Sequence, residues 1–359
     1  MKKIFFAAFA AVALTACVAD VVTEEPTYAI EFASSAKGTI KSTVITTNNL
    51  PSFQVFAFDG NGNVIMDTEN NKGMKVTQGK NESGVYNGTW SYSPNRYWPA
   101  NTDVDFYGVY ADIPSTNDIV FNYSAAPDTG LEFTLRMPRL TSEGKFVVDA
   151  SRVPDAVYAA AMNREQKDGA VNMIFRHAMA QVDFKIKNAT APADNVTIEW
   201  GGVYVNDLLC DGTYTINGET TDDKTTSPTG DWDLTNPDKV NYFFGANATA
   251  LVEEEAVTFV SAGKTTGSIL ETNCLVFPQT TGNSEVDFKV KCTIKQNGVV
   301  IFNDYKTAKV KVDWQQGHKY TYTFVLEDGY LTNNLIKISA AVVDYKDADD
   351  TKQPTKDIQ

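Results

Sequence analysis

Apolar and polar residues alternate with a period of two along many short stretches of this chain. Residues 286–295, VDFKVKCTIK, carry apolar side chains at every second position, with charged residues or threonine between them. The same alternation recurs in residues 308–314, 319–328 and 335–345. This period predicts strands that bury one face and leave the other in water. Turn-forming residues such as Asn297 and Gly298 separate these stretches, as expected between successive β-strands.

The first half of the chain shows the same pattern. Residues 52–59 and 64–67 flank the polar sequence GNGN, which predicts a β-hairpin. Residues 104–111 and 131–137 predict further strands. Short strands joined by polar turns favour an all-β chain built of β-sandwiches, with few short helices, over alternating strands and helices.

One stretch has a different pattern. Residues 155–166, DAVYAAAMNREQ, predict a short helix with Asp155 as its N-cap, directly after Pro154. A polar sequence then precedes a new series of strands, which predicts a domain boundary there. A mature chain of about 340 residues is long enough for two domains. The predicted domains are residues 17–168 and residues 169–359.

The start of the chain predicts an export signal. Lys2 and Lys3 precede an uncharged apolar run over residues 4–14, which is too short for a membrane-spanning helix of about 20 residues. Residues 14–17, Leu-Thr-Ala-Cys, resemble a bacterial lipobox. On that resemblance residues 1–16 are a lipoprotein signal peptide and the sulfur of Cys17 carries acyl chains such as palmitate, which anchor the chain stably. Cleavage by the general signal peptidase, with no role for Cys17, is the alternative.

The charge of the chain limits its partners. Without Lys2 and Lys3, 29 basic and 45 acidic residues remain, a net charge of about −16. Phosphate backbones repel such a protein, so nucleic acid is not an expected partner. An anionic membrane surface does not attract it either, so the lipid on Cys17 must provide the attachment.

Three cysteines remain after Cys17. Cys292 is in phase with the apolar residues of its strand, which predicts a small buried side chain. An odd number of cysteines cannot form a complete disulfide framework. A bridge between Cys274 and Cys292 is open to an exported protein, although no spacing supports it, and Cys210 has no assigned state.

No set of residues indicates catalysis, a metal or a cofactor. His177 is expected to be a partly buried, hydrogen-bonded residue and His318 a surface turn residue, since neither has further ligands at zinc spacing. Asp59, Asn61 and Asn63 begin like a calcium loop, but Val64 stands where that loop needs glycine, so a hairpin turn is predicted. The serine–lysine spacings at Ser34 and Ser142 lack the partner motifs of penicillin-binding enzymes. The chain is therefore not expected to be an enzyme.

Four aromatic residues are close in sequence: Trp90, Tyr92, Tyr97 and Trp98. They allow two interpretations. Packing at a turn is the first, and an aromatic platform on which a sugar stacks is the second.

Three segments together resemble one family. Residues 155–188 combine an Asp-x-x-Tyr-Ala sequence with a strand that ends in Phe-x-His-Ala. Residues 97–111 contain a Tyr-Trp-Pro turn before an aromatic-rich strand, and residues 314–329 contain a Gly-x-x-Tyr-x-Tyr strand. With the lipobox, their order and spacing resemble the fimbrillin-like proteins of Bacteroidetes, the subunits of type V pili.

The resemblance implies two tandem transthyretin-like β-sandwich domains and export as a lipoprotein to the outer membrane, exposed at the cell surface. It also implies that a protease removes an N-terminal strand and that a strand from another subunit takes its place, as strand addition allows. The first strand candidate is residues 28–32, and Lys37 and Lys41 follow as candidate cut sites. The family's best-known members are cut after arginine, whereas no arginine precedes Arg96 here.

The resulting expectation is a structural or accessory subunit of a cell-surface fimbria that contributes to adhesion. Its expected partners are other fimbrial subunits, identical or different, the outer membrane, and a ligand on a host or bacterial surface. Residues 335–345 either complete their own sheet or serve as the donated strand. The alternative function is a glycan-binding outer-membrane lipoprotein.

Overall fold

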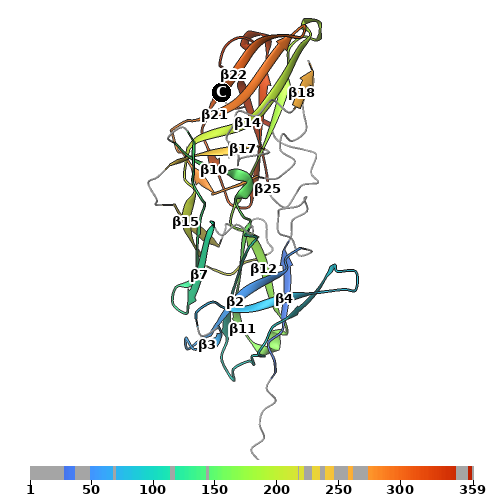
Figure 1. Ribbon diagram of the computed structural model, residues 1–359. Coiled ribbons are helices and arrows are strands. Elements are labelled where there is room, and N and C mark those ends of the chain that lie inside the picture. Colours follow the sequence, from blue (N-terminus) through green and yellow to red (C-terminus); the bar gives the residue numbers. More distant parts are fainter. Residues whose placement is uncertain are drawn as a thin grey trace, which may run out of the picture.

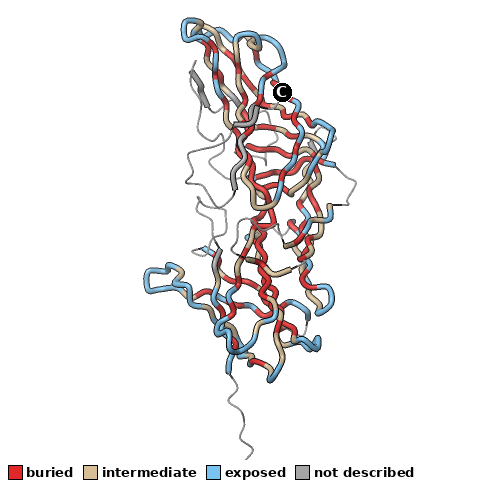
Figure 2. Tube along the Cα trace, turned by 180° about the vertical axis from the view of Figure 1, so that it is seen from behind, coloured by how far each residue is buried: buried red, intermediate tan, exposed pale blue. Residues whose placement is uncertain are grey.

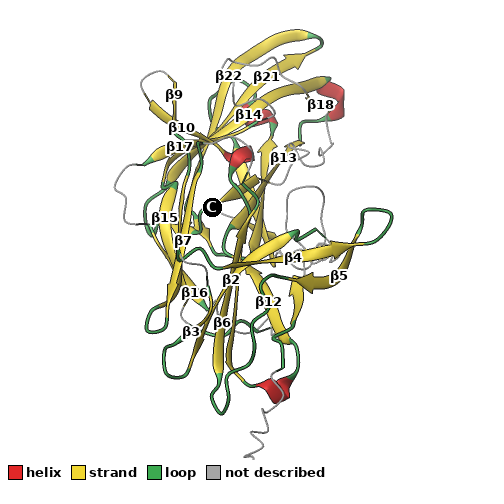
Figure 3. Ribbon diagram, turned by 60° about the horizontal axis from the view of Figure 1, so that its bottom comes forward, coloured by secondary structure: helices red, strands yellow, loops and turns green. Residues whose placement is uncertain are grey.

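Strands dominate the part of the protein that the structure describes, as Figures 1 and 3 show for a computed structural model. The structure describes residues 28–36, 49–67, 70–113, 118–142, 145–216, 218–221, 229–234, 239–245, 258–261, 274–344 and 355–357. Within these ranges the only helices are four 3-10 helices of three residues each: η1 (Ala150–Arg152), η2 (Gln166–Asp168), η3 (Pro192–Asp194) and η4 (Asp328–Tyr330). The all-β prediction is confirmed.

The largest sheet has eight strands and lies at one end of an elongated molecule (Figure 1). Its order is β1 (Phe32–Ala36), β12 (Val171–His177), β11 (Ala156–Arg164), β6 (Val104–Ala111), β2 (Ser52–Asp59), β4 (Met74–Lys80) and β5 (Tyr86–Ser91), with β3 (Val64–Met66) paired to β2. β12 begins after residue 168, so this sheet joins residues from both sides of the predicted domain boundary.

A seven-stranded sheet forms the opposite end of the molecule (Figure 1). It contains β22 (Val299–Val310), β21 (Val286–Gln296), β14 (Val196–Leu208), β17 (Val240–Phe244), β10 (Lys145–Asp149) and β9 (Leu140–Ser142), with β18 (Thr258–Ser261) paired to β14.

Three smaller sheets complete the fold. The five-stranded one contains β19 (Cys274–Val276), β13 (Ala180–Asn188), β24 (His318–Leu326), β25 (Lys337–Asp344) and β26 (Thr355–Asp357). The four-stranded one contains β16 (Gly230–Asp233), β15 (Asp211–Ile216), β8 (Gly130–Arg136) and β7 (Val120–Ala126). The last is the pair β20 (Gln279–Thr280) and β23 (Asp313–Trp314).

The prediction of a helix over residues 155–166 is wrong, because residues 156–164 form strand β11. This strand pairs antiparallel with β6 over most of its length. Its residues 156–161 are all buried, so both of its faces are covered. Alanine has the highest helix propensity, but propensity is a small term, and the pairing with β6 together with burial on two sides outweighs it.

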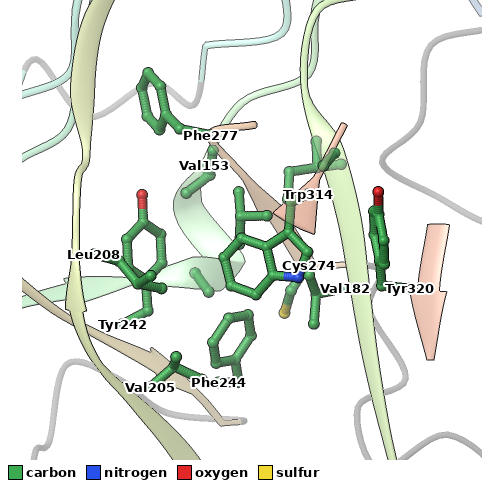
Figure 4. Close-up of a cluster of buried hydrophobic side chains, with 14 of the residues drawn as sticks. Val153, Val182, Val205, Leu208, Tyr242, Phe244, Cys274, Phe277, Trp314 and Tyr320 are labelled. Carbon is green, nitrogen blue, oxygen red and sulfur yellow. The ribbon is translucent and has the colours of Figure 1, made fainter. Parts of the chain in front are cut away.

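β11 lies between two hydrophobic cores. The even-numbered residues 156–160 belong to a large cluster that continues through the second half of the chain, whereas the odd-numbered residues 157–161 belong to a smaller cluster that also holds β1 and β2. Figure 2 shows buried residues along the length of the molecule. In Figure 4, the indole of Trp314 lies among the side chains of Tyr242, Phe244 and Phe277 in the large cluster. The two cores are therefore joined through a shared strand.

The hairpin of β21 and β22 confirms the alternation predicted for residues 286–295, since Val286, Phe288, Val290, Cys292 and Ile294 are all buried. Its turn uses Asn297 and Gly298, both with positive φ angles, of 52° and 78°. Two consecutive positive φ angles define a type I′ turn, which matches the twist of the flanking strands.

We expect Gly298→Ala to lower the free energy of unfolding by about 1 kcal/mol, because a Cβ disfavours this backbone conformation. No heavy atom lies within 4 Å of a Cβ placed at this glycine, so the loss of stability would come from the φ angle alone. Gly329→Ala is the matched control, because its Cβ also meets nothing and its φ is not positive. Urea unfolding of both variants measures the difference, and equal stabilities would contradict the assignment of the turn.

Candidate functional site

The first described residues form an edge of the eight-stranded sheet. β1 pairs in parallel with β12, from Phe32 opposite Val171 to Ala36 opposite Phe175. On its other side, the preceding residues meet the segment after β5: Ile30 N donates to Arg96 O at 2.9 Å, and a bridge joins Ala29 to Tyr97. The segment is thus held between two parts of the chain that lie far from it in sequence.

The side chains of this segment fill the smaller core. Ile30 and Phe32 are only 2% and 8% exposed. The Phe32 ring makes edge contacts with Phe53, Tyr92 and Phe106, with centroid distances of 5.9, 5.7 and 5.9 Å. Burying each of the two side chains contributes about 1.5–3 kcal/mol. β1 is therefore a structural part of the core, although it stands at the edge of a sheet.

Three of the four aromatic residues considered as a platform are turned toward β1 and the core. The Tyr92 hydroxyl donates to Ile30 O at 2.8 Å, and burial raises the pKa of this hydroxyl, which keeps it protonated as a donor. Trp90 packs on Phe53, and Trp98 is buried against Phe106.

The fourth ring, Tyr97, is 49% exposed. The four side chains therefore do not share one outward surface, and the contacts of Trp98 fit the packing interpretation.

The predicted processing and lipidation sites lie at the border of the structure or beyond it. Cys17, Lys37 and Lys41 are outside the described residues. β1 ends at Ala36, so the first candidate cut site directly follows the strand that fills the core.

A buried ionisable pair lies where β11 and β12 meet. His177 Nδ1 is 3.0 Å from Asp155 Oδ1, and both side chains are almost completely buried. Asp155 therefore does not cap a helix, as the sequence had suggested. His177 is the buried, hydrogen-bonded residue that was predicted, and His318 is half-buried at the start of β24, where its Nδ1 meets Gln316 O.

Replacing His177 by leucine is expected to lower the free energy of unfolding by about 2 kcal/mol, because the buried Asp155 carboxylate loses its imidazole partner. The protein has only one other histidine, so His318→Leu is a matched control with an expected change of about 0.5 kcal/mol or less. Thermal unfolding of the two variants provides the comparison. A His318→Leu loss as large as that of His177→Leu would argue against the pair.

The residues that begin like a calcium loop form a turn. Asp59 Oδ1 accepts hydrogen bonds from Asn61 N and Asn63 N at 2.9 and 2.8 Å, which closes the predicted hairpin turn. Across the described ranges, no group of three or more potential ligands could hold a metal ion. None of the described helices is long and apolar enough to cross a membrane.

The three cysteines after Cys17 are buried and form no disulfide: Cys210, Cys274 and Cys292. The bridge left open between Cys274 and Cys292 is therefore not formed. Burial raises the pKa of the Cys292 thiol to about 12, which makes it an unreactive core side chain.

Lys306 is a buried cation that was not predicted from the sequence. It lies on β22 in phase with buried Phe302 and Ala308, and this phase is the signal that could have revealed it. Its ammonium group donates to the carbonyl oxygens of Tyr330, Leu331 and Asn333. It thereby fixes the connection between β24 and β25 to the edge of the seven-stranded sheet.

Comparison with known proteins identifies the family of this chain. Residues 39–344 match the model of the fimbrillin-like family, and residues 1–17 match that of the prokaryotic membrane lipoprotein lipid attachment site. The chain belongs to the fimbrillin-like family, so the resemblance stated from its motifs is confirmed. Among curated protein sequences, none matches the chain.

The chain is similar to several solved structures, and the first two of those described here show the same fold. A fimbrial protein from Bacteroides vulgatus is 15% identical, with a TM-score of 0.58 over 88% of this chain and 99% of its own. A candidate cell adhesion protein from Bacteroides uniformis is 14% identical, with a TM-score of 0.51 over 88% and 99%. A fimbrial assembly protein from Parabacteroides distasonis is 10% identical, with a TM-score of 0.43 over 93% and 99%.

Proposed function

We propose that this protein is a structural or accessory subunit of a cell-surface fimbria that contributes to adhesion and assembles by donor-strand exchange. A protease removes β1 by cutting after Lys37 or Lys41, and a strand from another subunit takes its place. The lipid on Cys17 holds the subunit at the outer membrane before it is cut. The observation that carries the proposal is β1 itself, an edge strand that fills the core and ends directly before Lys37.

Loss of β1 would leave backbone groups and apolar side chains without their partners, and this favours binding of a replacement strand. The β12 backbone would lose its parallel partner over residues 171–175, and unpaired edge groups readily accept another strand. The rings of Phe53, Tyr92 and Phe106 would lose contact with Phe32. A donated strand with alternating apolar residues would restore both the hydrogen bonds and the apolar contacts.

The arrangement of the cores supports two β-sandwich domains of transthyretin type that meet at β11 and β12. In the single subunit, β25 pairs with β24 from His318 opposite Asp344 to Val325 opposite Lys337. Residues 337–344 therefore complete their own sheet here. Other fimbrial subunits, identical or different, are the partners from which a strand would come.

Limited digestion of the purified mature protein with a trypsin-like protease tests the proposal. We expect loss of the residues up to Lys37 or Lys41, followed by a ladder of assembled species that resists detergent. A Lys37→Ala, Lys41→Ala double variant is the control and should stay uncut and monomeric. Cutting without assembly, together with glycan binding that depends on the Trp90–Trp98 region, would favour the glycan-binding alternative.

A further inference from the structure

We propose that the strand which replaces β1 carries a carboxamide side chain, asparagine or glutamine, at the position of Ser34. The inference rests on the proposed function, because it concerns the occupant of the same site. Three buried polar atoms near β1 carry it: Ser34 Oγ, Gln78 Oε1 and Trp90 Nε1. Within the part of the chain that the structure describes, none of these atoms has a hydrogen-bond partner.

Gln78 and Trp90 are adjacent and face the core. They lie opposite each other in the antiparallel pair of β4 and β5. Gln78 shares the inward face of β4 with Met74 and Val76 and is only 4% exposed. Trp90 packs on the Phe53 ring at a centroid distance of 5.1 Å. Both side chains therefore lie against the smaller core, to which Phe32 of β1 also belongs.

Ser34 enters the same region from β1. It lies two residues after Phe32 and therefore points to the same side of the strand. Phe32 contacts Phe53, the residue on which Trp90 packs, and β1 lies against β5. The three polar atoms that lack partners therefore belong to the strands that form the interface between β1 and the hairpin of β4 and β5.

The chemistry of these groups selects the side chain that would satisfy them. The amide of Gln78 presents an acceptor, and the indole of Trp90 presents a donor. The short serine side chain bonds to neither the Gln78 amide nor the Trp90 indole. An apolar residue would also leave both buried groups unpaired. A charged residue would have to give up its hydration. A carboxamide offers one acceptor and two donor hydrogens on a longer, uncharged side chain.

This requirement also bears on the source of the donated strand. β25, with the sequence KISAAVVD, contains neither asparagine nor glutamine. The chemistry therefore indicates a donor segment other than β25. It also implies that β1 is an imperfect occupant, which favours its exchange.

Labelled peptides test the inference during protease treatment of the full chain. Each peptide has the sequence of residues 28–36 with serine, asparagine, glutamine or valine at position 34, and the dissociation constant of captured peptide is measured. We expect the asparagine or glutamine peptide to bind about tenfold more tightly than the serine peptide, and the valine peptide to show no such gain. In a Gln78→Met, Trp90→Phe variant the advantage should disappear.

A second measurement uses the uncut chain. In Ser34→Asn or Ser34→Gln, hydrogen exchange at the Val171 amide, which donates to Glu31 O, should slow about tenfold, whereas Ser34→Ala should not slow it. Equal capture of all four peptides would overturn the inference and leave strand exchange standing. Capture of no peptide, the serine one included, would overturn the proposed function and the inference with it. Unchanged hydrogen exchange at the Val171 amide in both carboxamide variants would show that Gln78 and Trp90 do not favour a strand with a carboxamide at position 34.

Discussion

A Cys17→Ala chain is expected to carry no lipid at all. Residues 1–17 match a lipoprotein lipid attachment site, and Cys17, the last of them, is the cysteine expected to carry the lipid. Several acyl chains on one residue give an attachment that a single chain cannot, so loss of the sulfur removes the whole anchor. Metabolic labelling with a radioactive fatty acid should therefore give a labelled band for the unchanged chain and none for the variant.

A second cysteine provides the control for this experiment. Cys292→Ala also removes a thiol, but this thiol is buried in β21 and has no route to a lipid. The Cys292→Ala chain should therefore be labelled like the unchanged protein. Mass spectrometry of the purified unchanged protein should also show that the mature chain begins at Cys17. A labelled Cys17→Ala chain would contradict the assignment of the anchor.

Strands whose pattern depends only on neighbouring residues could be predicted from the sequence. The alternation in β21 and β24 places one set of side chains in the core, and the structure agrees. The turn at Asn297 and Gly298 follows from the same local reasoning, because few residues accept two positive φ angles.

The features that failed or were missed depend on distant parts of the chain. The alanine-rich residues 156–164 favour a helix locally, and only their pairing with β6 makes them a strand. The parallel pairing of β1 with β12 joins residues more than a hundred positions apart, and no local pattern encodes it. The unpaired atoms of Gln78 and Trp90 likewise emerge only when β1, β4 and β5 come together.

Lys306 is expected to contribute more to stability than an exposed lysine does, because its side chain is buried. Its side chain is completely shielded on β22, and its ammonium group lies 3.9 Å from the centroid of the Phe302 ring. The ammonium also donates to three carbonyls of residues 330–333. Removing the ammonium takes a charged donor from these three carbonyl oxygens, and hydrogen bonds to a charged group contribute more than an exposed ion pair.

We therefore expect Lys306→Met, which keeps a long apolar side chain, to lower the free energy of unfolding by about 3 kcal/mol. Lys309→Met is the matched control on the same strand, since Lys309 is exposed and pairs with Asp287 at the surface; its expected loss is at most about 0.5 kcal/mol. Urea unfolding gives both values. Hydrogen exchange should also quicken at the Thr307 and Ile336 amides in Lys306→Met alone, because Thr307 N donates to Asn334 O and Ile336 N to Thr307 O. Equal losses in the two variants, with unchanged exchange, would mean that the connection before β25 is held by its backbone pairing and that the buried cation adds nothing.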